Sequence, residues 1–152
     1  MPKYEHILLA SEGREITPRA VDIAAGMATS TVSVISIARV HGTAFGLQTP
    51  GLMPTRAEWQ EQRDLVAKAV KALRKRGLES SGHVVGTRKA TKTIVEEARV
   101  KGCEAIVMAA DAPRNRFIAD FMWTQEPYRV GRRGHRAHLP VYVVTDESII
   151  EL

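Results

Sequence analysis

The chain has 152 residues, a length typical of one domain that buries a substantial core. Hydrophobic residues make up 44% of it and charged residues 26%, which is close to the average for globular proteins and excludes a disordered chain or a coiled coil. No stretch approaches the roughly 18 uninterrupted apolar residues of a membrane-spanning helix, and the first residues lack the apolar region of a secretory signal. We therefore expect a single cytoplasmic domain over residues 1–152.

One cysteine and an excess of basic residues narrow the chemistry further. Cys103 has no partner for an intramolecular disulfide, and its place just before an apolar strand predicts a small buried residue. The net charge is +5, and the run from Arg129 to His138 contains four arginines and two histidines but no acidic residue. Because no nucleic-acid-binding module accompanies this run, it predicts a solvated basic face rather than a nucleic-acid surface.

The predicted elements begin with an apolar strand at 6–10. A helix follows, because Thr17 fits an N-cap and Pro18 fits the first helical position, where its missing N–H costs nothing. The second strand, 32–37, is rich in β-branched residues, as expected of a strand that is covered on both faces. Glycines, a proline and the absence of periodicity then indicate a long loop over 39–53.

A capping box opens the next helix. In Thr55–Glu58 the threonine and the glutamate can satisfy each other's exposed backbone donors. Basic residues and Gly77 end that helix, as expected from the helix dipole and from C-cap preferences. A short strand around 83–85, a helix over 91–101 and a strand over 105–109 follow.

The last predicted strand is Val141–Val144, after Pro140. Pro127, Gly131 and Gly134 predict that any helix before this strand is broken or short. The alternation of strands and helices predicts an α/β fold, namely an open, mostly parallel, five-stranded, doubly wound sheet with helices on both faces.

In such a sheet, ligands bind at the carboxyl ends of the strands. The chain offers four segments that follow predicted strands. They are 10–14, 38–41, 86–89 and 109–116. Any small-molecule site is expected to draw on them.

Four segments resemble universal stress proteins. Ile7–Gly13, followed by Thr17, is similar to the opening of that family, and Gly86–Ala90 resembles its third strand and helix. Residues 105–108 resemble its fourth strand, and residues 140–144 resemble its closing strand. The resemblance covers nearly the whole chain in the right order. It implies that family's Rossmann-like fold and a regulatory role in the stress response.

Members of the family that bind ATP carry a glycine signature after the fourth strand, where backbone N–H groups approach the phosphates. In this chain Arg114, Phe117 and Pro127 stand roughly where those glycines belong. Glu12 stands where the family usually has an aspartate, at the position that meets the adenosine part of the ligand. The resemblance therefore implies a divergent member without conventional ATP binding.

Three alternatives stay open for the ligand: ATP in the conventional way, a nucleotide such as ATP or AMP or another anion held by arginine side chains, or no small ligand. The residues of a nucleotide or anion site would be Ala10, Glu12, Val40, Met108, Ala110, Arg114, Arg116, Arg129 and Arg132. No spacing typical of a catalytic or metal site is present. We expect a protein that is not an enzyme, with at most weak ATPase activity.

Partners are implied by the resemblance. Relatives pair their closing strand across a two-fold axis, which implies a homodimer through Val141–Val144. Phe121–Arg129 resembles a segment of the cytosolic stress-protein modules attached to transporters, which implies an unidentified protein partner, with a transporter among the candidates. An apolar cluster overlaps this segment and is expected to fill the space of the missing ligand or to contact a subunit. It consists of Phe117, Ile118, Phe121, Met122 and Trp123.

Overall fold

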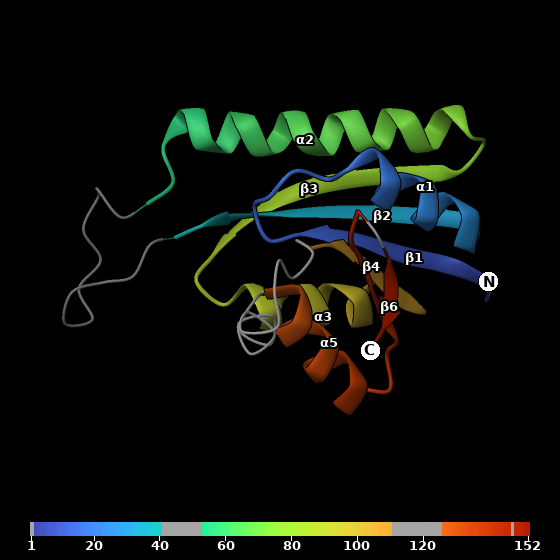
Figure 1. Cartoon of the computed structure of the whole chain (residues 1–152). Coiled ribbons are helices and arrows are strands. Elements are labelled where there is room, and N and C mark those ends of the chain that lie inside the picture. Colours follow the sequence, from blue (N-terminus) through green and yellow to red (C-terminus); the bar gives the residue numbers. More distant parts are fainter. Residues whose placement is uncertain (1, 41–52, 111–125, 147) are drawn as a thin grey trace.

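The computed structural model describes residues 2–40, 53–110, 126–146 and 148–152 (Figure 1). In chain order its elements are β1 (Tyr4–Ser11), α1 (Pro18–Met27), β2 (Ala28–Arg39), α2 (Arg56–Lys75), β3 (Glu79–Thr87), α3 (Ala90–Val100), β4 (Ala105–Ala109), α5 (Glu126–Arg136), β5 (Val141–Val144) and β6 (Ile149–Glu151). The strands form one sheet in the order β3-β2-β1-β4-β5-β6. All neighbouring strands are parallel except β5 and β6, so the predicted mostly parallel α/β fold is confirmed.

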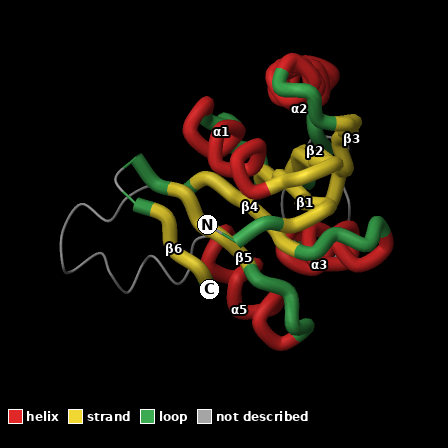
Figure 2. The backbone as a smooth tube through the Cα atoms, turned by 90° about the vertical axis from the view of Figure 1, so that its right-hand side faces the viewer, coloured by secondary structure: helices red, strands yellow, loops and turns green. Residues whose placement is uncertain are grey.

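Helices cover both faces of the sheet, as Figure 2 shows: α1 and α2 lie on one side, and α3 and α5 lie on the other. The central strand β1 supplies both cores, because successive side chains of a strand point to opposite faces. Ile7 and Leu9 are fully buried beneath α1 and α2, and Leu8 is fully buried against α3 and α5. This double burial explains why the strand is a continuous apolar run.

The two predicted helix starts are confirmed. Thr17 Oγ1 accepts a hydrogen bond from the Ala20 backbone N–H at 3.1 Å, and Thr55 Oγ1 accepts one from the Glu58 N–H at 3.1 Å. Each bond satisfies one of the backbone donors that a helix leaves open at its start. Gly77 follows α2 with a φ of 81°, the left-handed conformation that favours glycine after a helix.

The sheet has six strands in the described residues, not the predicted five. β6 pairs antiparallel with β5, so the expectation that Val141–Val144 presents a free edge is wrong. Thr145 and Ser148 are hydrogen-bonded to each other between the two strands: the Thr145 N–H donates to the Ser148 carbonyl at 2.9 Å, and the Ser148 N–H donates to Thr145 Oγ1 at 3.0 Å. β6 has only three residues, too few to give a recognisable period in the sequence.

The prediction of a broken or short helix before β5 is wrong, because α5 is continuous over 11 residues. Pro127 is its second residue, where a missing N–H is tolerated. A Cβ atom on Gly131 would lie 2.3 Å from Leu152 Cδ1, and one on Gly134 would lie 2.7 Å from Val141 Cγ2. These glycines therefore allow α5 to pack closely against the end of the sheet.

Several predictions lie outside the described residues. They concern most of the loop expected over 39–53, the apolar cluster, Arg114, Arg116 and most of the segment Phe121–Arg129. In the parts of the chain that the structure describes, no helix combines the length and apolar character needed to span a membrane.

Candidate functional site

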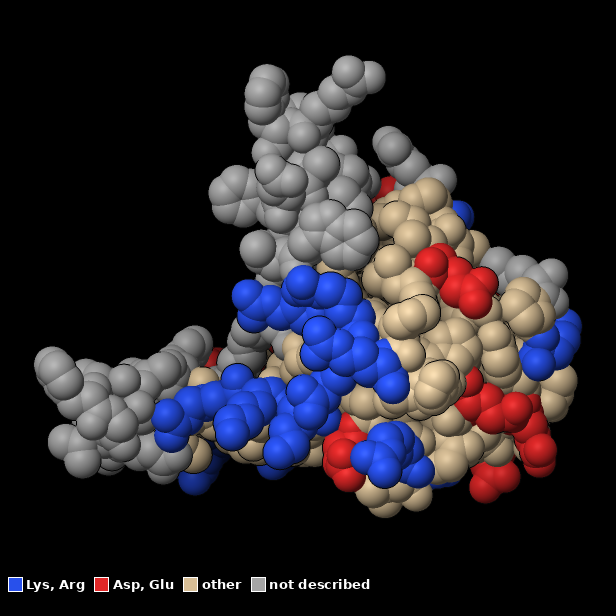
Figure 3. Space-filling model, turned by 90° about the horizontal axis from the view of Figure 1, so that it is seen from below, with Lys and Arg blue, Asp and Glu red and all other residues tan. Residues whose placement is uncertain are grey.

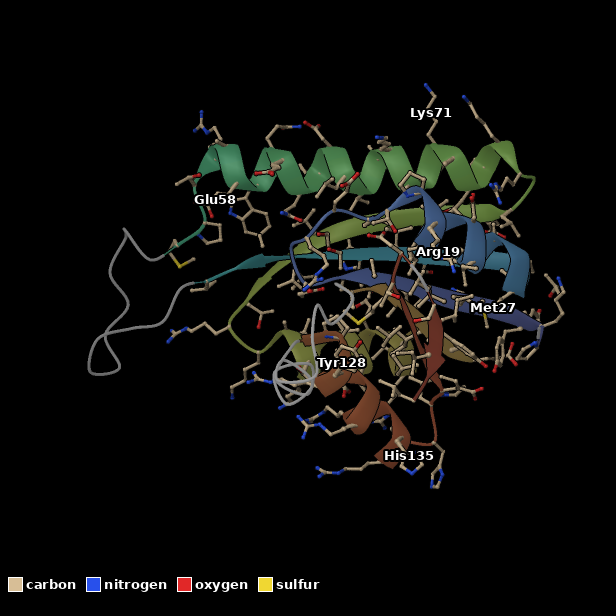
Figure 4. All side chains as sticks on the ribbon, viewed as in Figure 1. Arg19, Met27, Glu58, Lys71, Tyr128 and His135 are labelled. Carbon is tan, nitrogen blue, oxygen red and sulfur yellow. The ribbon has the colours of Figure 1, made fainter. Side chains whose placement is uncertain are left out.

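A cavity of about 440 Å³ opens where β1 and β2 end, below the first turns of α2. Figure 4 places Glu58 at that end of α2, above the carboxyl ends of the strands. The cavity is lined by Glu12, Gly13, Arg14, Ile37, Ala38, Glu58, Glu61 and Gln62. Its position agrees with the rule that open parallel sheets bind ligands at their carboxyl ends.

The turn after β1 shapes one wall of this cavity. Ser11 Oγ donates to the Arg14 carbonyl and accepts a hydrogen bond from the Gly13 N–H at 3.2 Å. Gly13 has a φ of 116°, and a Cβ there would lie 3.2 Å from the Ile37 carbonyl oxygen. Only glycine therefore fits this turn without strain, which fixes how Glu12 enters the site.

Gln62 joins three elements around the cavity. Its Nε2 donates to the Gly13 carbonyl at 3.1 Å, and its Oε1 accepts a hydrogen bond from the Ser36 hydroxyl in β2. Both Gln62 and Ser36 are buried, and a buried amide without partners would cost free energy. Gln62 is not among the site residues predicted from the sequence. Its one indication in the sequence is that a polar residue stands between Trp59 and Val66 on the inner, otherwise apolar face of α2.

Negative charge dominates the lining. Glu12 is buried, with 5% of its surface exposed, and forms an ion pair with Arg14. Glu58 and Glu61 add two carboxylates from the first turns of α2, so the described lining holds three carboxylates and one guanidinium. This balance opposes a phosphate group and suits neutral or hydroxyl-bearing ligand atoms.

Among the described residues of the predicted site, only Glu12 lines the cavity. Ala10 and Met108 are opposite each other in the β1–β4 register and are buried in the core beside α3 and α5. The Ala110 N–H donates to the Val144 carbonyl at 2.9 Å, and the Val40 N–H donates to the Thr87 carbonyl at 3.2 Å. These two residues stand at the carboxyl ends of β4 and β2.

The described arginines of the predicted site lie on α5. Arg129 and Arg132 are exposed, and Arg132 lines a different hollow of about 310 Å³ together with His135, Arg136 and Leu152. Figure 3 shows basic side chains gathered on the side of the molecule where α3 and α5 lie. The structure therefore does not bring Arg132 into the cavity that contains Glu12.

Tyr128 connects the start of α5 to the site. Its side chain is 1% exposed and points toward the sheet in Figure 4. Burial raises the pKa of its hydroxyl above the ordinary tyrosine value, and the nearby Arg14 guanidinium opposes that rise. Tyr128 is therefore a neutral neighbour of Arg14 within the core beside α3 and α5, and it does not line the cavity.

The remaining candidates for chemistry are the Cys103 thiol and a metal site. Cys103 is buried, as predicted, and burial raises the pKa of its thiol to about 11. In the described residues no three His, Cys, Asp or Glu side chains are grouped to hold a metal ion, and both His135 and His138 are exposed.

Comparison with known proteins adds family information to this geometry. A model described as the universal stress protein family matches residues 3–125. The chain also resembles a solved universal stress family protein from Burkholderia pseudomallei, with 21% identity, a TM-score of 0.62, and coverage of 93% of this chain and 96% of the other. Among curated proteins no sequence matches the chain.

Two further similar structures contain nucleotides. A universal stress protein in complex with cAMP has 16% identity and a TM-score of 0.64, with coverage of 94% of this chain and 98% of the other. The universal stress protein from Archaeoglobus fulgidus in complex with dAMP has 18% identity and a TM-score of 0.55, with coverage of 93% and 97%. At these identities the likeness concerns the fold.

Proposed function

Because the chain belongs to the universal stress protein family, we propose that it is a regulatory stress-response protein that catalyses no reaction and does not bind ATP in the conventional way. The observation that carries this proposal is the acidic lining of the cavity at the ends of β1 and β2. None of the described lining residues is a serine, cysteine, threonine, lysine or histidine, so the cavity offers no side chain of the usual nucleophiles.

Charge opposes a triphosphate in this cavity. Glu58 and Glu61 would face the phosphates, and Glu12 already engages Arg14. Like charges 4 Å apart repel by about 1 kcal/mol in water and about 4 kcal/mol at the effective dielectric constant of a protein surface. Gly13 is the one glycine among the described lining residues, whereas a phosphate cradle needs several approachable backbone N–H groups.

The test is a calorimetric titration of ATP and adenosine into the wild type and into a Glu58→Gln, Glu61→Gln double variant. We expect no saturable ATP binding by the wild type at millimolar concentration. The double variant should bind ATP saturably at millimolar concentration, where the wild type does not, and should bind adenosine no more tightly than the wild type, since only the phosphates meet the removed charges.

The matched control is Glu79→Gln with Glu104→Gln, which removes the same charge from residues outside the cavity lining. Micromolar ATP binding by the wild type, or an equal gain in the control, would refute the role of the acidic lining.

A second candidate function is an AMP-type nucleotide sensor that holds a single phosphate with arginine side chains. The cAMP and dAMP complexes of similar folds favour it, since both ligands carry one phosphate. The buried amide of Gln62 and the carboxylate of Glu12 suit the nucleoside part of such a ligand. This function requires saturable AMP binding that weakens in Arg114→Ala, and no binding at millimolar AMP would exclude it.

We also propose that the chain acts as a homodimer, with β6 in place of β5 beside the two-fold axis. β6 ends this side of the described sheet. Leu152 and Val141 exchange two backbone hydrogen bonds, so the alternate residue Glu151 directs its N–H away from β5. Light scattering should give a dimer for the wild type and Glu151→Thr, and a monomer for Glu151→Pro. A monomeric wild type at micromolar concentration contradicts this.

A further inference from the structure

The other end of the sheet is β3, which has a neighbouring strand on one side only in the described residues. The Thr87 carbonyl accepts a hydrogen bond from the Val40 N–H, so Thr87 directs its backbone toward β2. Because backbone direction alternates along a strand, Gly82, Val84 and Gly86 direct their N–H and C=O groups away from the sheet.

A hydrogen bond at the start of β3 confirms that this set of backbone groups points away from the sheet. The carbonyl of Ser80, which belongs to the same alternate set, accepts a hydrogen bond from Arg74 Nε at 2.9 Å. In the described part of the chain, the outward groups of Gly82, Val84 and Gly86 have no such partner. β3 therefore presents a free edge whose first position is already occupied by an arginine.

Helix α2 overhangs this edge. A Cβ on Gly82 would lie 2.6 Å from Val66 Cγ1, and a Cβ on Gly86 would lie 2.9 Å from Trp59 Cζ2, so both glycines allow the helix to approach the strand. Figures 1 and 2 show α2 running along the side of the sheet that ends in β3. A groove of about 520 Å³ lies between them. It is lined by Trp59, Arg63, Val66, Ala67, Val70, Arg74, Ser81, Gly82, His83 and Val84.

The groove combines apolar surface with positive charge. On α2, Trp59 lies against Gly86 and Val66 lies against Gly82. Arg63 comes between Trp59 and Val66, so it stands beside Val84 at the centre of the free edge. Arg63 has no ion-pair partner among the described residues, and no acidic residue lines the groove. A carboxylate is the natural partner for such a guanidinium.

We propose that this groove binds an extended acidic peptide, which adds to the sheet as a strand beside β3. The free backbone groups of β3 would pair with the peptide, and Arg63 would bind a carboxylate at its centre. Side chains two positions away from that carboxylate lie about 6.6 Å along the peptide on the same face. Along α2, Trp59 lies about 6 Å from Arg63, which is close to that peptide spacing. Apolar residues two positions from the carboxylate would therefore lie beside the apolar parts of the groove.

The positive charge of α2 also favours an acidic peptide over a second copy of this chain as the partner of β3. Pairing two β3 edges across a two-fold axis would place two α2 helices side by side. Each α2 carries six Lys and Arg against three Asp and Glu, so the two helices would repel each other. An acidic peptide meets the same surface with complementary charge.

The experiment uses a fluorescein-labelled heptapeptide with glutamate at its fourth position, valine at its second and sixth, and threonine elsewhere. Fluorescence anisotropy with the full chain should show saturable binding that weakens with added salt. The same peptide with lysine in place of glutamate should bind at least tenfold more weakly, as should Arg63→Glu with the original peptide. Failure to bind at millimolar protein overturns the proposal, as does equal binding of the two peptides.

Two protein variants test pairing at the edge itself. Val84→Pro removes an outward N–H without removing a bond to β2, and Val84→Thr keeps that N–H. We expect Val84→Pro to lose binding at least tenfold and Val84→Thr to retain it. Equal binding by the two variants contradicts strand addition. A wild-type dimer that Val84→Pro converts to a monomer also contradicts it, because a second copy would then occupy the edge.

A modified peptide keeps the test decisive if Val84→Pro fails to fold. N-methylation of alternate peptide amides blocks one edge of the added strand, and methylation of the other set blocks the opposite edge. One set should abolish binding to the wild-type chain and the other should leave it intact. Equal effects of the two sets would overturn strand addition.

Discussion

At the scale of single residues, a few side chains decide the shape and charge of the candidate site. Glu12 could be predicted, because it follows an apolar strand and strand ends form the ligand edge of such a sheet. Gln62, Glu58 and Glu61 could not be predicted as site residues, because α2 reaches the cavity from about 50 residues further along the chain. No local pattern encodes that packing.

Cys103 gives a pH prediction at this scale. Burial raises the pKa of its thiol from 9.0 to about 11 in the folded protein. A raised folded-state pKa contributes stability that is present below the unfolded value and is lost as pH rises toward 11. The free energy of unfolding should fall between pH 9 and pH 11 by more in the wild type than in Cys103→Ala. Urea unfolding at a series of pH values measures this, and parallel curves for both proteins would contradict it.

At the scale of elements, strong apolar runs and caps were the reliable signals. The predicted bounds of β4 and β5 are those of the structure, and the Thr17 and Thr55 caps are in place. β3 is longer than predicted, because serines and glycines at its exposed edge hide its period. The glycines of α5 are unfavourable for a helix in isolation. Gly131 is needed there because it lies against Leu152, and this contact is non-local and cannot be predicted from the sequence.

Gly131→Ala tests that packing. In an exposed helix, alanine in place of glycine stabilises by roughly 0.5–1 kcal/mol. At Gly131 the added Cβ meets Leu152, so we expect a net loss of about 1–3 kcal/mol, typical of overpacking. Gly26→Ala in α1 is the matched control, because its Cβ would meet nothing within 4 Å, and it should stabilise. Urea unfolding measures both, and a stabilised Gly131→Ala would contradict close packing of α5 on the C-terminal strand.

At the scale of the whole molecule, the fold is that of the universal stress protein family, and the features that the proposals use lie at the two ends of the sheet and at its ligand edge. β6 covers β5, and the groove beside β3 remains open at the opposite end. The family match ends at residue 125, so α5, β5 and β6 lie beyond it. We propose that partner contacts use these two ends of the sheet.

The acidic cavity is the central element of the proposed function, since its carboxylates oppose the charge of a triphosphate. The most direct measurement is to purify the protein without added nucleotide, denature it and analyse the released small molecules by mass spectrometry. We predict no ATP above the trace level of a control protein purified in the same way. ATP released in near-equal amount to the protein would contradict the proposal.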